Sequence, residues 1–286
     1  MEIYGRTDLA SEAHLICSGV RGESHEIPGI SACQEILNGF SVTTVEVLNH
    51  IGARTLGKPV GKYFSLELKS HFDRGSEAFP ALAETIADLI RRCAVFRDTG
   101  CVLIAALGNP DITPDALGSL AASNILITRH LKQHAPEEFA AFRVTALCRT
   151  GVLGTTGVES AVQIKTLCCE LRPSLVIAVD ALAGSDVKHL CRTVQICNSG
   201  ISPGSGVGNN REELSEASLG VPVVAIGVPT VADASCFSDE PPLTSLFVTP
   251  RDIDSSVRSL GRLIGYGVNL ALHEGLTVDD VDMLIG

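Results

Sequence analysis

The sequence predicts an α/β fold with a mostly parallel central sheet flanked by helices. Short apolar runs alternate with segments of helical periodicity at least three times along the 286 residues, which is the pattern of βαβ units. Apolar residues make up 45% of the chain, whereas aromatic residues make up 4% and Trp is absent. The core must therefore be built from Val, Ile, Leu and Ala, as in strands that are buried on both faces. No linker or internal repeat interrupts the chain, so we expect one domain over residues 1–286.

The first 60 or so residues are irregular, with Gly, Pro and polar clusters. Two segments within them alternate well enough to be extra N-terminal strands, Val42–Leu48 and Phe64–Leu68. From Pro80 the pattern becomes clearer, because Leu82, Ile86, Leu89, Ile90 and Cys93 follow helical spacing.

The continuous apolar run Val102–Leu107 predicts a buried strand that leads into a loop. The next helix is expected to begin at Thr113-Pro114 and to run towards Leu131, because Thr is a good N-cap and Pro is favoured at the first helical position. A short strand is expected at Val144–Leu147.

The glycine-rich stretch Gly151–Gly157 predicts a turn. Thr156 and Glu159 have the spacing of a capping box and predict a helix that runs to about Leu171. A buried strand at Leu175–Val179 then ends at Asp180.

The last third of the chain continues the alternation. We expect a loop at Ser199–Leu219, because Gly, Ser and charged residues are concentrated there. The other elements expected in this part are strands at Thr193–Cys197, Val221–Val228 and Phe247-Val248, and a helix from Ile253 to about His273.

Charge and cysteine usage exclude several classes of function. The net charge of −11 argues against direct binding to nucleic acid or to an anionic membrane surface, both of which need clustered Lys and Arg. The ten cysteines include no C-x-x-C pair, and the first residues lack the apolar stretch of a signal peptide. No run approaches the roughly 18 apolar residues that span a bilayer. We therefore expect reduced thiols and a cytoplasmic protein.

Asp115 and Asp180 are the candidate catalytic pair. Ligands of open α/β sheets bind beyond the carboxyl ends of the strands, and both residues follow such ends. A position in the first turn of a helix should keep the pKa of Asp115 low, whereas burial should raise the pKa of Asp180. Two carboxyl groups with separated pKa values can serve as base and acid towards water and a peptide. In the alternative interpretation, Asp115 only starts a helix and Asp180 only forms loop hydrogen bonds.

Other motifs leave their alternatives open. GVLGTTG, at 151–157, either presents backbone N–H groups to an oxyanion or forms a tight turn. Gly204–Asn209 is glycine-rich like a phosphate loop but lacks the strand–GxxxxGK[ST]–helix context. The chain has no G-x-S-x-G elbow, and His130, His189 and His273 do not have metal-ligand spacing.

Nine motifs are spread over nearly the whole chain. They are RTDLASEAH at 6–14, GKPVGKYFSLE at 57–67, LGNPDITPDALG at 107–118, TRHL at 128–131, GVLGTTGVES at 151–160, VDALA at 179–183, GISPGSGVGNNR at 200–211, VPVVAIGVPTVADA at 221–234 and FVTPRDID at 247–254. These motifs, in this order, resemble those of the germination protease (spore endopeptidase) family.

The resemblance implies a fold like that of the hydrogenase-maturation peptidases, a homotetramer, and cleavage of small acid-soluble spore proteins in the spore core during germination. It places the family's two catalytic aspartates on Asp115 and Asp180. The expected substrate or backbone-loop residues are Gly108, Asn109, Gly154, Thr155, Thr156 and Gly157. We expect no cofactor, but in the related maturation peptidases the position of Asp115 contacts a metal, so a metal ion at Asp115 and Asp180 remains an alternative.

The family is made as a zymogen, so a short propeptide is expected within about residues 1–12, removed by self-cleavage next to Glu12. The chain departs from the family beside the site, with CRT at 148–150, CNS at 197–199 and GSD at 184–186. Three functions are therefore weighed: an aspartate-dependent endopeptidase, a non-catalytic protein that binds peptides on the same scaffold, and a metal-dependent maturation-type peptidase.

Overall fold

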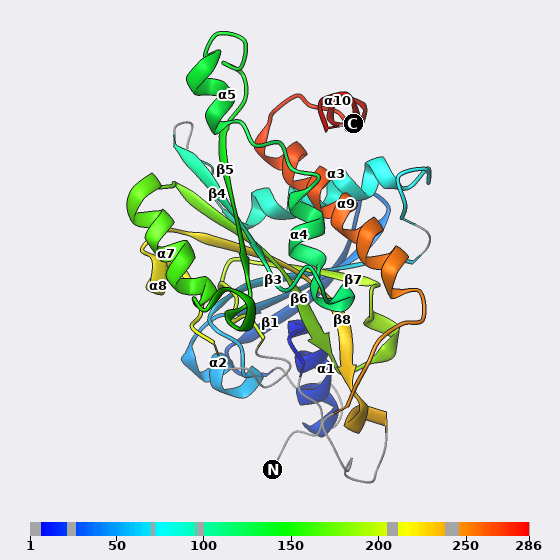
Figure 1. Ribbon diagram of the computed structural model, residues 1–286. Helices are drawn as coiled ribbons and strands as arrows, with labels where there is room; N and C mark the ends of the chain where they lie inside the picture. Colours follow the sequence, from blue (N-terminus) through cyan, green and yellow to red (C-terminus); the bar gives the residue numbers. More distant parts are fainter. Residues whose placement is uncertain are drawn as a thin grey trace.

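The structure is a computed structural model and describes residues 7–21, 27–69, 72–94, 96, 100–204, 211–237 and 246–285. Within these residues, nine strands form one sheet in the order β1-β2-β3-β7-β8-β6-β4-β5, and β9 pairs with β8. Helices cover both faces of this sheet (Figure 1), so the predicted α/β class is confirmed. Among the described residues, no helix is both long and apolar enough to cross a membrane.

Four strands form the parallel part of the sheet. Their pairings β5–β4, β4–β6 and β6–β8 are all parallel. The three inner strands of this group, β4, β6 and β8, carry the continuous apolar runs of the sequence because helices bury them on both faces, whereas the edge strand β5 is only partly buried. Their bounds are β4 Cys101–Leu107, β5 Val144–Gly151, β6 Leu175–Gly184 and β8 Val223–Asp233.

The other five pairings are antiparallel, so the prediction of a mostly parallel sheet is wrong. They join β1 to β2, β2 to β3, β3 to β7, β7 to β8 and β8 to β9. The β1–β2 hairpin turns at Asn38 and Gly39, whose φ angles of 50° and 88° suit a two-residue turn with left-handed residues. The remaining strands are β1 Ile30–Leu37, β2 Phe40–Val47, β3 Gly61–Glu67, β7 Thr193–Cys197 and β9 Phe247–Val248.

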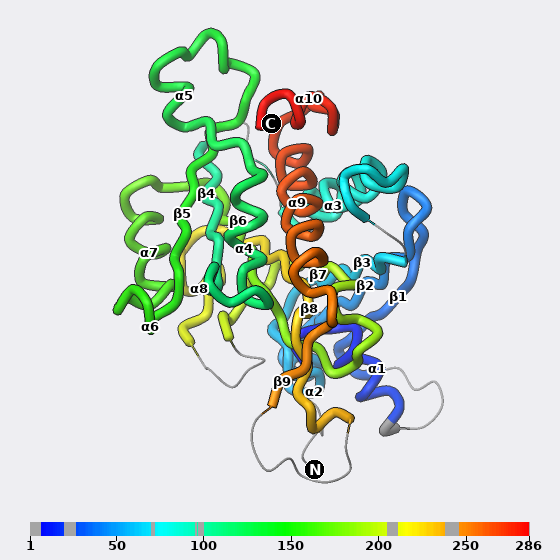
Figure 2. Tube along the Cα trace, turned by 45° about the vertical axis from the view of Figure 1, so that its right-hand side comes forward, coloured from blue at the N-terminus to red at the C-terminus, as the bar shows by residue number. Residues whose placement is uncertain are grey.

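Three helices pack together on one face of the sheet, where α9 lies against both α3 and α4 (Figure 2). Their apolar residues and those of the strands beneath form the largest core cluster. The rings of Phe79 and Tyr266 meet edge to face there, 5.2 Å apart between centroids. The helices on this face are α3 Phe79–Cys93, α4 Leu117–Ala122, α9 Ile253–Leu272 and the C-terminal α10 Val278–Ile285.

The opposite face carries two separate groups of helices. α7 and α8 pack over the parallel strands, whereas α1 and α2 pack over β2 and β3. The bounds are α1 Ala10–Arg21, α2 His50–Leu56, α7 Ser160–Leu171 and α8 Glu216–Leu219. The short elements are η1 Thr113–Asp115, α5 Arg129–His134, α6 Leu153–Thr156, η2 Val187–His189 and η4 Ala234–Phe237.

The continuous helix predicted from Thr113 to Leu131 is broken. Ile112, not Thr113, precedes the first turn, and α4 ends at Ala122. The side chain of Asn269 on α9 accepts a hydrogen bond from the Leu126 nitrogen and donates one to the Asn124 oxygen, both at 2.8 Å. These bonds satisfy backbone groups that a continued helix would have used.

Two further predictions are corrected. Glu159 precedes α7 without a side-chain capping bond, so the capping box with Thr156 does not form. Strand β6 does not end before Asp180 but continues to Gly184, because β8 pairs with it throughout this stretch. Residues 205–210, which include most of the predicted phosphate loop, lie outside the described residues.

Candidate active site

A cavity of about 400 Å³ lies beyond the carboxyl ends of β4 and at the outer half of β6 and β8, where sheet topology predicts a site. It is lined by residues from every segment that converges there. They are Asp8, Gly108, Ile112, Pro114, Asp115, Val152, Ser160, Asp180, Ala181, Leu182, Ala183, Pro203, Gly204, Arg211, Thr230, Val231, Phe247 and Thr249. The structure therefore brings the two predicted catalytic residues, Asp115 and Asp180, into one cavity.

Asp180 lies within β6, directly opposite Gly227 of β8, and is 3% exposed. Its Oδ1 accepts a hydrogen bond from the Ala181 nitrogen at 3.0 Å. Burial raises the pKa of Asp180 well above its usual range, and the negative charge of Asp115 raises it further. The predicted upward shift is confirmed, although the residue lies inside a strand rather than at its end.

Asp115 ends the short helix η1, and its Oδ2 accepts a hydrogen bond from the Asn109 nitrogen at 2.7 Å. The expected low pKa is wrong. Burial raises the pKa of Asp115 more than the Asn109 N–H group and the charge of Arg211 lower it. A single turn of 3₁₀ helix offers little dipole, so desolvation decides the direction.

Gly108 allows this close arrangement. Its φ angle is 91°, in the left-handed region, and a Cβ atom there would lie 2.1 Å from the Asp115 carbonyl oxygen. Any side chain at this position would therefore push Asp115 away from the end of β4. Of the predicted loop residues, Gly108 lines the cavity itself, and Asn109 holds the Asp115 carboxylate.

The other predicted loop residues lie beside the cavity. Gly154, Thr155 and Thr156 belong to the exposed short helix α6, and Gly157 follows it. Val152 and Ser160, on either side of this stretch, line the cavity instead. The backbone N–H groups of Thr155, Thr156 and Gly157 are used within α6, since they donate to the carbonyl oxygens of Val152 and Leu153.

Arg211 is the one positively charged residue among the described lining residues. Its charge lowers the pKa of both Asp115 and Asp180. The arginine therefore counters part of the repulsion that two buried carboxylates exert on each other. Sequence reasoning did not select Arg211, although it ends the GISPGSGVGNNR motif.

Asp8 is the other charged residue that sequence reasoning missed, although it lies in the RTDLASEAH motif. It comes from the segment before α1, 172 positions before Asp180 in the chain, and lines the same cavity. Spacing alone offers no signal for such a neighbour, since it depends on how the N-terminal segment meets β6.

Glu12, the predicted self-cleavage position, lies in the first turn of α1 and is 3% exposed. Its Oε2 accepts hydrogen bonds from the Ser185 nitrogen and the Ser185 hydroxyl, both at 2.7 Å, and its Oε1 lies 2.6 Å from His189 Nδ1. Although burial alone would raise the pKa of Glu12, these hydrogen bonds hold it below its usual value. In this arrangement Glu12 ties α1 to the end of β6.

The donor set for a metal is limited. Among the described residues, no three His, Cys, Asp or Glu side chains converge where they could hold a metal ion. The two carboxyl groups of the cavity lie in different environments, since Asp180 is buried and Asp115 is partly exposed.

Comparison with known proteins finds similar sequences that all carry one family description. The pattern of the family described as "Germination protease" matches residues 10–241. The chain is 37% identical to a germination protease of Caldanaerobacter subterraneus subsp. tengcongensis and 34% identical to one of Clostridium tetani, with at least 97% of each chain covered. A germination protease of Bacillus cereus is 39% identical over 80% of this chain and 63% of its own length.

Proposed function

Because the chain belongs to the germination protease family, we propose that it is an endopeptidase that uses Asp115 and Asp180 to add water to a peptide bond of small acid-soluble spore proteins. The observation that supports this mechanism is the pair itself. Two carboxyl groups share one cavity, and one of them is far more deeply buried than the other. Such a pair holds one proton more tightly at the buried member, which separates an acid from a base.

In the proposed reaction, ionised Asp115 accepts a proton from water while the water oxygen bonds to the peptide carbonyl carbon. Protonated Asp180 then donates its proton to the leaving nitrogen as the carbon–nitrogen bond breaks. The proton taken up by Asp115 replaces the one lost by Asp180 before the next cycle, so the site returns to its starting state. General acid–base catalysis of this kind contributes about 10²–10⁴ in rate.

The surroundings of the two groups support these roles. The Asn109 N–H group and the Arg211 charge both favour the ionised form of Asp115. Asp180 lies deeper and next to the Asp115 charge, and both burial and this charge favour its protonated form. Because the two carboxyl groups interact, the pH–rate profile is expected to show two apparent pKa values that belong to the pair rather than to either residue.

The family resemblance supports the remaining parts of the proposal. They are a fold like that of the hydrogenase-maturation peptidases, synthesis as a zymogen, assembly into a homotetramer, and action in the cytoplasm of the spore core. The substrate would be engaged as a protein rather than through its nucleic acid, in keeping with the net charge of −11.

The test is cleavage of a small acid-soluble spore protein by the wild type and by Asp115→Asn and Asp180→Asn, each with and without a chelator. Asp111→Asn is the matched control, because Asp111 is exposed in the same loop and does not line the cavity. We expect the control to cut at the wild-type rate and both site variants to lose at least about 10²-fold while remaining folded.

Other outcomes would overturn parts of the proposal. Binding of the substrate without cleavage by the wild type would identify a non-catalytic protein. Loss of wild-type activity in the chelator, with recovery on addition of a divalent metal, would identify the metal-dependent variant. Retention of activity in either Asn variant would remove that residue from the mechanism.

A further inference from the structure

A separate cavity of about 390 Å³ lies between α1 and the antiparallel part of the sheet. Its walls come from α1, from strands β1, β2, β3 and β7, and from η2. It shares no described lining residue with the active-site cavity. This cavity, the α1 cavity, is therefore distinct from the site of Asp115 and Asp180.

The sheet face beneath the α1 cavity changes from apolar to polar along the strands. Val45 and Tyr63 are paired across β2 and β3 and belong to the core cluster under α1 and α2. Two residues further along each strand, Thr43 and Ser65 are paired on the same face, because side chains alternate between the faces of a sheet. Both line the cavity, so polar side chains lie where a core face would carry apolar ones.

Glu67 of β3 and Thr193 of β7 form the next pair on this face, and both line the α1 cavity. Directly opposite residues have Cβ atoms about 4.5–5.5 Å apart. Thr193 is 2% exposed, and its Oγ1 has no hydrogen-bond partner among the described residues. Within the same part of the chain, the Glu67 carboxylate makes no hydrogen bond or ion pair. The pair therefore offers two neighbouring acceptors that the described fold leaves unused.

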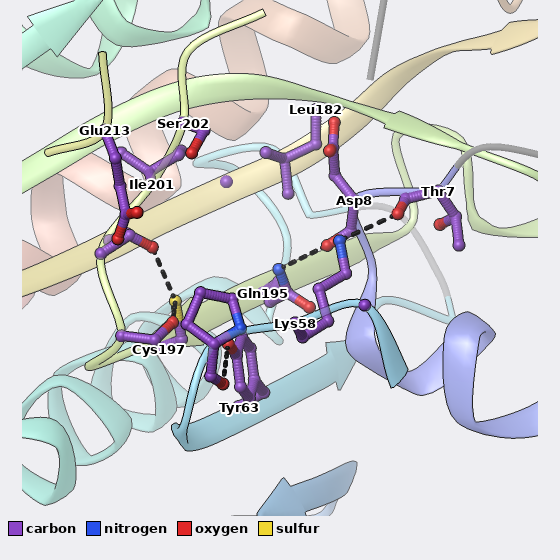
Figure 3. A pocket seen from close by; sticks show the side chains of 16 residues that line it. Thr7, Asp8, Lys58, Tyr63, Leu182, Gln195, Cys197, Ile201, Ser202 and Glu213 are labelled. Carbon is purple, nitrogen blue, oxygen red and sulfur yellow. Dashed lines mark hydrogen bonds between the residues drawn. The ribbon is translucent and has the colours of Figure 1, made fainter. Parts of the chain in front are cut away.

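The neighbouring cavity, of about 310 Å³, shows the contrast. There the Tyr63 hydroxyl donates to the Pro59 oxygen at 2.7 Å, and the Ser199 hydroxyl donates to Cys197 Sγ at 3.5 Å (Figure 3). These polar groups are thus bonded within the fold. Leaving a buried hydroxyl without a partner is unfavourable, so the unused pair in the α1 cavity points to a missing donor.

The charges around the α1 cavity favour a cation. Among its described lining residues none is Lys or Arg. Burial lowers the pKa of His14, so its imidazole is uncharged at neutral pH, and His189 Nδ1 lies 2.6 Å from Glu12 Oε1. The Glu67 carboxylate thus has no described counter-ion. An ammonium group has three donors and no acceptor, which matches a carboxylate beside an unpartnered hydroxyl.

The α1 cavity also has an apolar part. Leu15, 58% exposed on α1, and Ala32 of β1 belong to its lining. Its volume lies within the range of about 300–1,000 Å³ that is usual for small-molecule sites. An alkyl chain against these side chains, with its charged end at Glu67 and Thr193, matches the distribution of apolar and polar surface.

We propose that the α1 cavity binds a small primary alkylamine, whose ammonium group bonds the Glu67 carboxylate and the Thr193 hydroxyl and whose alkyl chain packs against Leu15. The site goes beyond the proposed peptidase function and does not depend on it. It does not depend on the segment before α1 either, because both polar groups lie on strands β3 and β7. The competing explanation is that water alone fills the cavity.

The test is titration of the full chain with 1,5-diaminopentane, followed by calorimetry at physiological ionic strength. We expect saturable binding of one diamine per chain. 1,5-Pentanediol has the same length without charge, and glutarate carries the opposite charge, so both should bind at least about tenfold more weakly. Equal binding of all three compounds, or no saturable binding of the diamine, would overturn the proposal.

Two variants locate the bound amine. Glu67→Gln removes the charge at nearly constant size and should weaken binding at least about tenfold. Thr193→Val removes the hydroxyl at nearly constant shape and should weaken binding about two- to tenfold. Because this hydroxyl has no described partner, Thr193→Val without the amine should unfold at the same temperature as the wild type or higher. Wild-type affinity in either variant contradicts the site.

Glu46→Gln is the matched control, since it changes the net charge by the same amount as Glu67→Gln. Glu46 is a partly buried glutamate of β2 whose carboxylate lies 3.6 Å from Lys62 Nζ, and it does not line the α1 cavity. Its variant should bind the diamine like the wild type. Equal weakening in Glu46→Gln and Glu67→Gln would assign binding to the general negative charge of the chain and overturn the proposal.

A lysine side chain of another protein carries the same ammonium group. Nα-acetyl-lysine N-methylamide presents that side chain between two peptide groups, so it is titrated beside the diamine. We expect the diamine to bind more tightly, because it has no peptide groups that must fit at the rim of the cavity. Tighter binding of the lysine derivative would overturn the assignment to a free amine.

Discussion

A Cβ atom at Gly118 would lie 2.6 Å from the carbonyl oxygen of Val179. Helix α4 therefore touches strand β6 main chain to main chain, one residue before Asp180. The same atom would lie 2.4 Å from the Leu107 oxygen at the end of β4. Because Asp115 lies just before α4 in the chain, this contact helps to set the distance between the carboxyl groups of Asp115 and Asp180.

Gly118→Ala should therefore damage both stability and activity. The added methyl group meets backbone atoms that cannot rotate away, so α4 must shift outward. We expect a loss of about 1–3 kcal/mol in the free energy of unfolding and a loss of at least about tenfold in kcat. Urea unfolding and peptide cleavage measure the two effects.

Gly19→Ala is the control for this prediction. Gly19 lies inside α1, where a Cβ atom would meet nothing within 4 Å. Alanine there should stabilise the protein by about 0.5–1 kcal/mol, since glycine is unfavourable within helices. A Gly118→Ala variant as stable and active as Gly19→Ala would show that α4 does not set the geometry of the site.

Asp180→Asn should stabilise the protein while abolishing its activity. The raised pKa of Asp180 means that the folded state binds its proton more tightly than the unfolded chain does. The Asp180 carboxyl group therefore contributes its full stabilisation at pH values below its pKa in the unfolded chain. This stabilisation is lost as the pH rises through its pKa in the folded protein. Asn carries no charge, so the variant should gain on the order of 1 kcal/mol at alkaline pH. Thermal unfolding at acid and alkaline pH measures this gain, and a variant that is less stable than the wild type at alkaline pH contradicts it.

Glu12→Gln should weaken the attachment of α1 to β6. Because the pKa of Glu12 is lowered in the folded protein, Glu12 stabilises the fold at pH values above its pKa in the unfolded chain. This stabilisation is lost as the pH falls through its pKa in the folded protein. We expect a loss of about 1–3 kcal/mol near neutral pH that shrinks in acid, measured by urea unfolding. Glu84→Gln, at an exposed position of α3, should change little. Equal effects of the two substitutions would show that the Glu12 bonds contribute no stability.

His273 should make the protein sensitive to mild acid. It is 2% exposed, and burial lowers its pKa to about 4. The neutral imidazole of His273 therefore contributes its full stabilisation at pH values above the ordinary histidine pKa. As the pH falls towards 4, the free energy of unfolding decreases by about 2–3 kcal/mol in total. His273→Asn can keep the acceptor that bonds the Arg143 nitrogen but cannot titrate.

The free energy of unfolding of His273→Asn should thus vary less with pH in this range than that of the wild type. His50→Asn, at the exposed start of α2, serves as the control and should follow the wild type. An unchanged slope in His273→Asn would assign the acid sensitivity to other groups.

Self-cleavage next to Glu12 would cut the chain within the first turn of α1. The first turn must therefore unwind before this bond can be cut. Mass spectrometry of protein that cuts substrate is the test. An N-terminus at Ala13 would support self-cleavage next to Glu12, and an uncut N-terminal segment would contradict it.

The buried half of the fold could be predicted from the sequence. Strands β4, β6 and β8 were found because continuous apolar runs are typical of strands covered on both faces. Strand β1 was missed because most of its residues are exposed and carry no such run. The helices α1, α2 and α10 were also missed.

Strand ends and pairings depended on distant partners. In the sequence, Asp180 and Pro229 each look like the end of a strand. In the structure, Asp180 of β6 pairs with β8 and Pro229 of β8 pairs with β6, and both strands continue beyond these residues. The antiparallel pairing of β3 with β7 joins segments about 130 positions apart, for which local periodicity offers no signal. The same limit hid Asp8 and Arg211, whereas Asp115 and Asp180 were found because each follows a predicted buried strand.

The bond between Asp8 and Ala183 spans 175 positions of the chain, and the cavity wall also needs Thr249. During synthesis on the ribosome, the N-terminal segment must therefore wait until most of the polypeptide has emerged before it finds its partner. A nascent chain, or a product of interrupted translation that stops before β8, has no complete cavity and should cut nothing. The order of synthesis thus delays proteolysis until the whole sheet has been made.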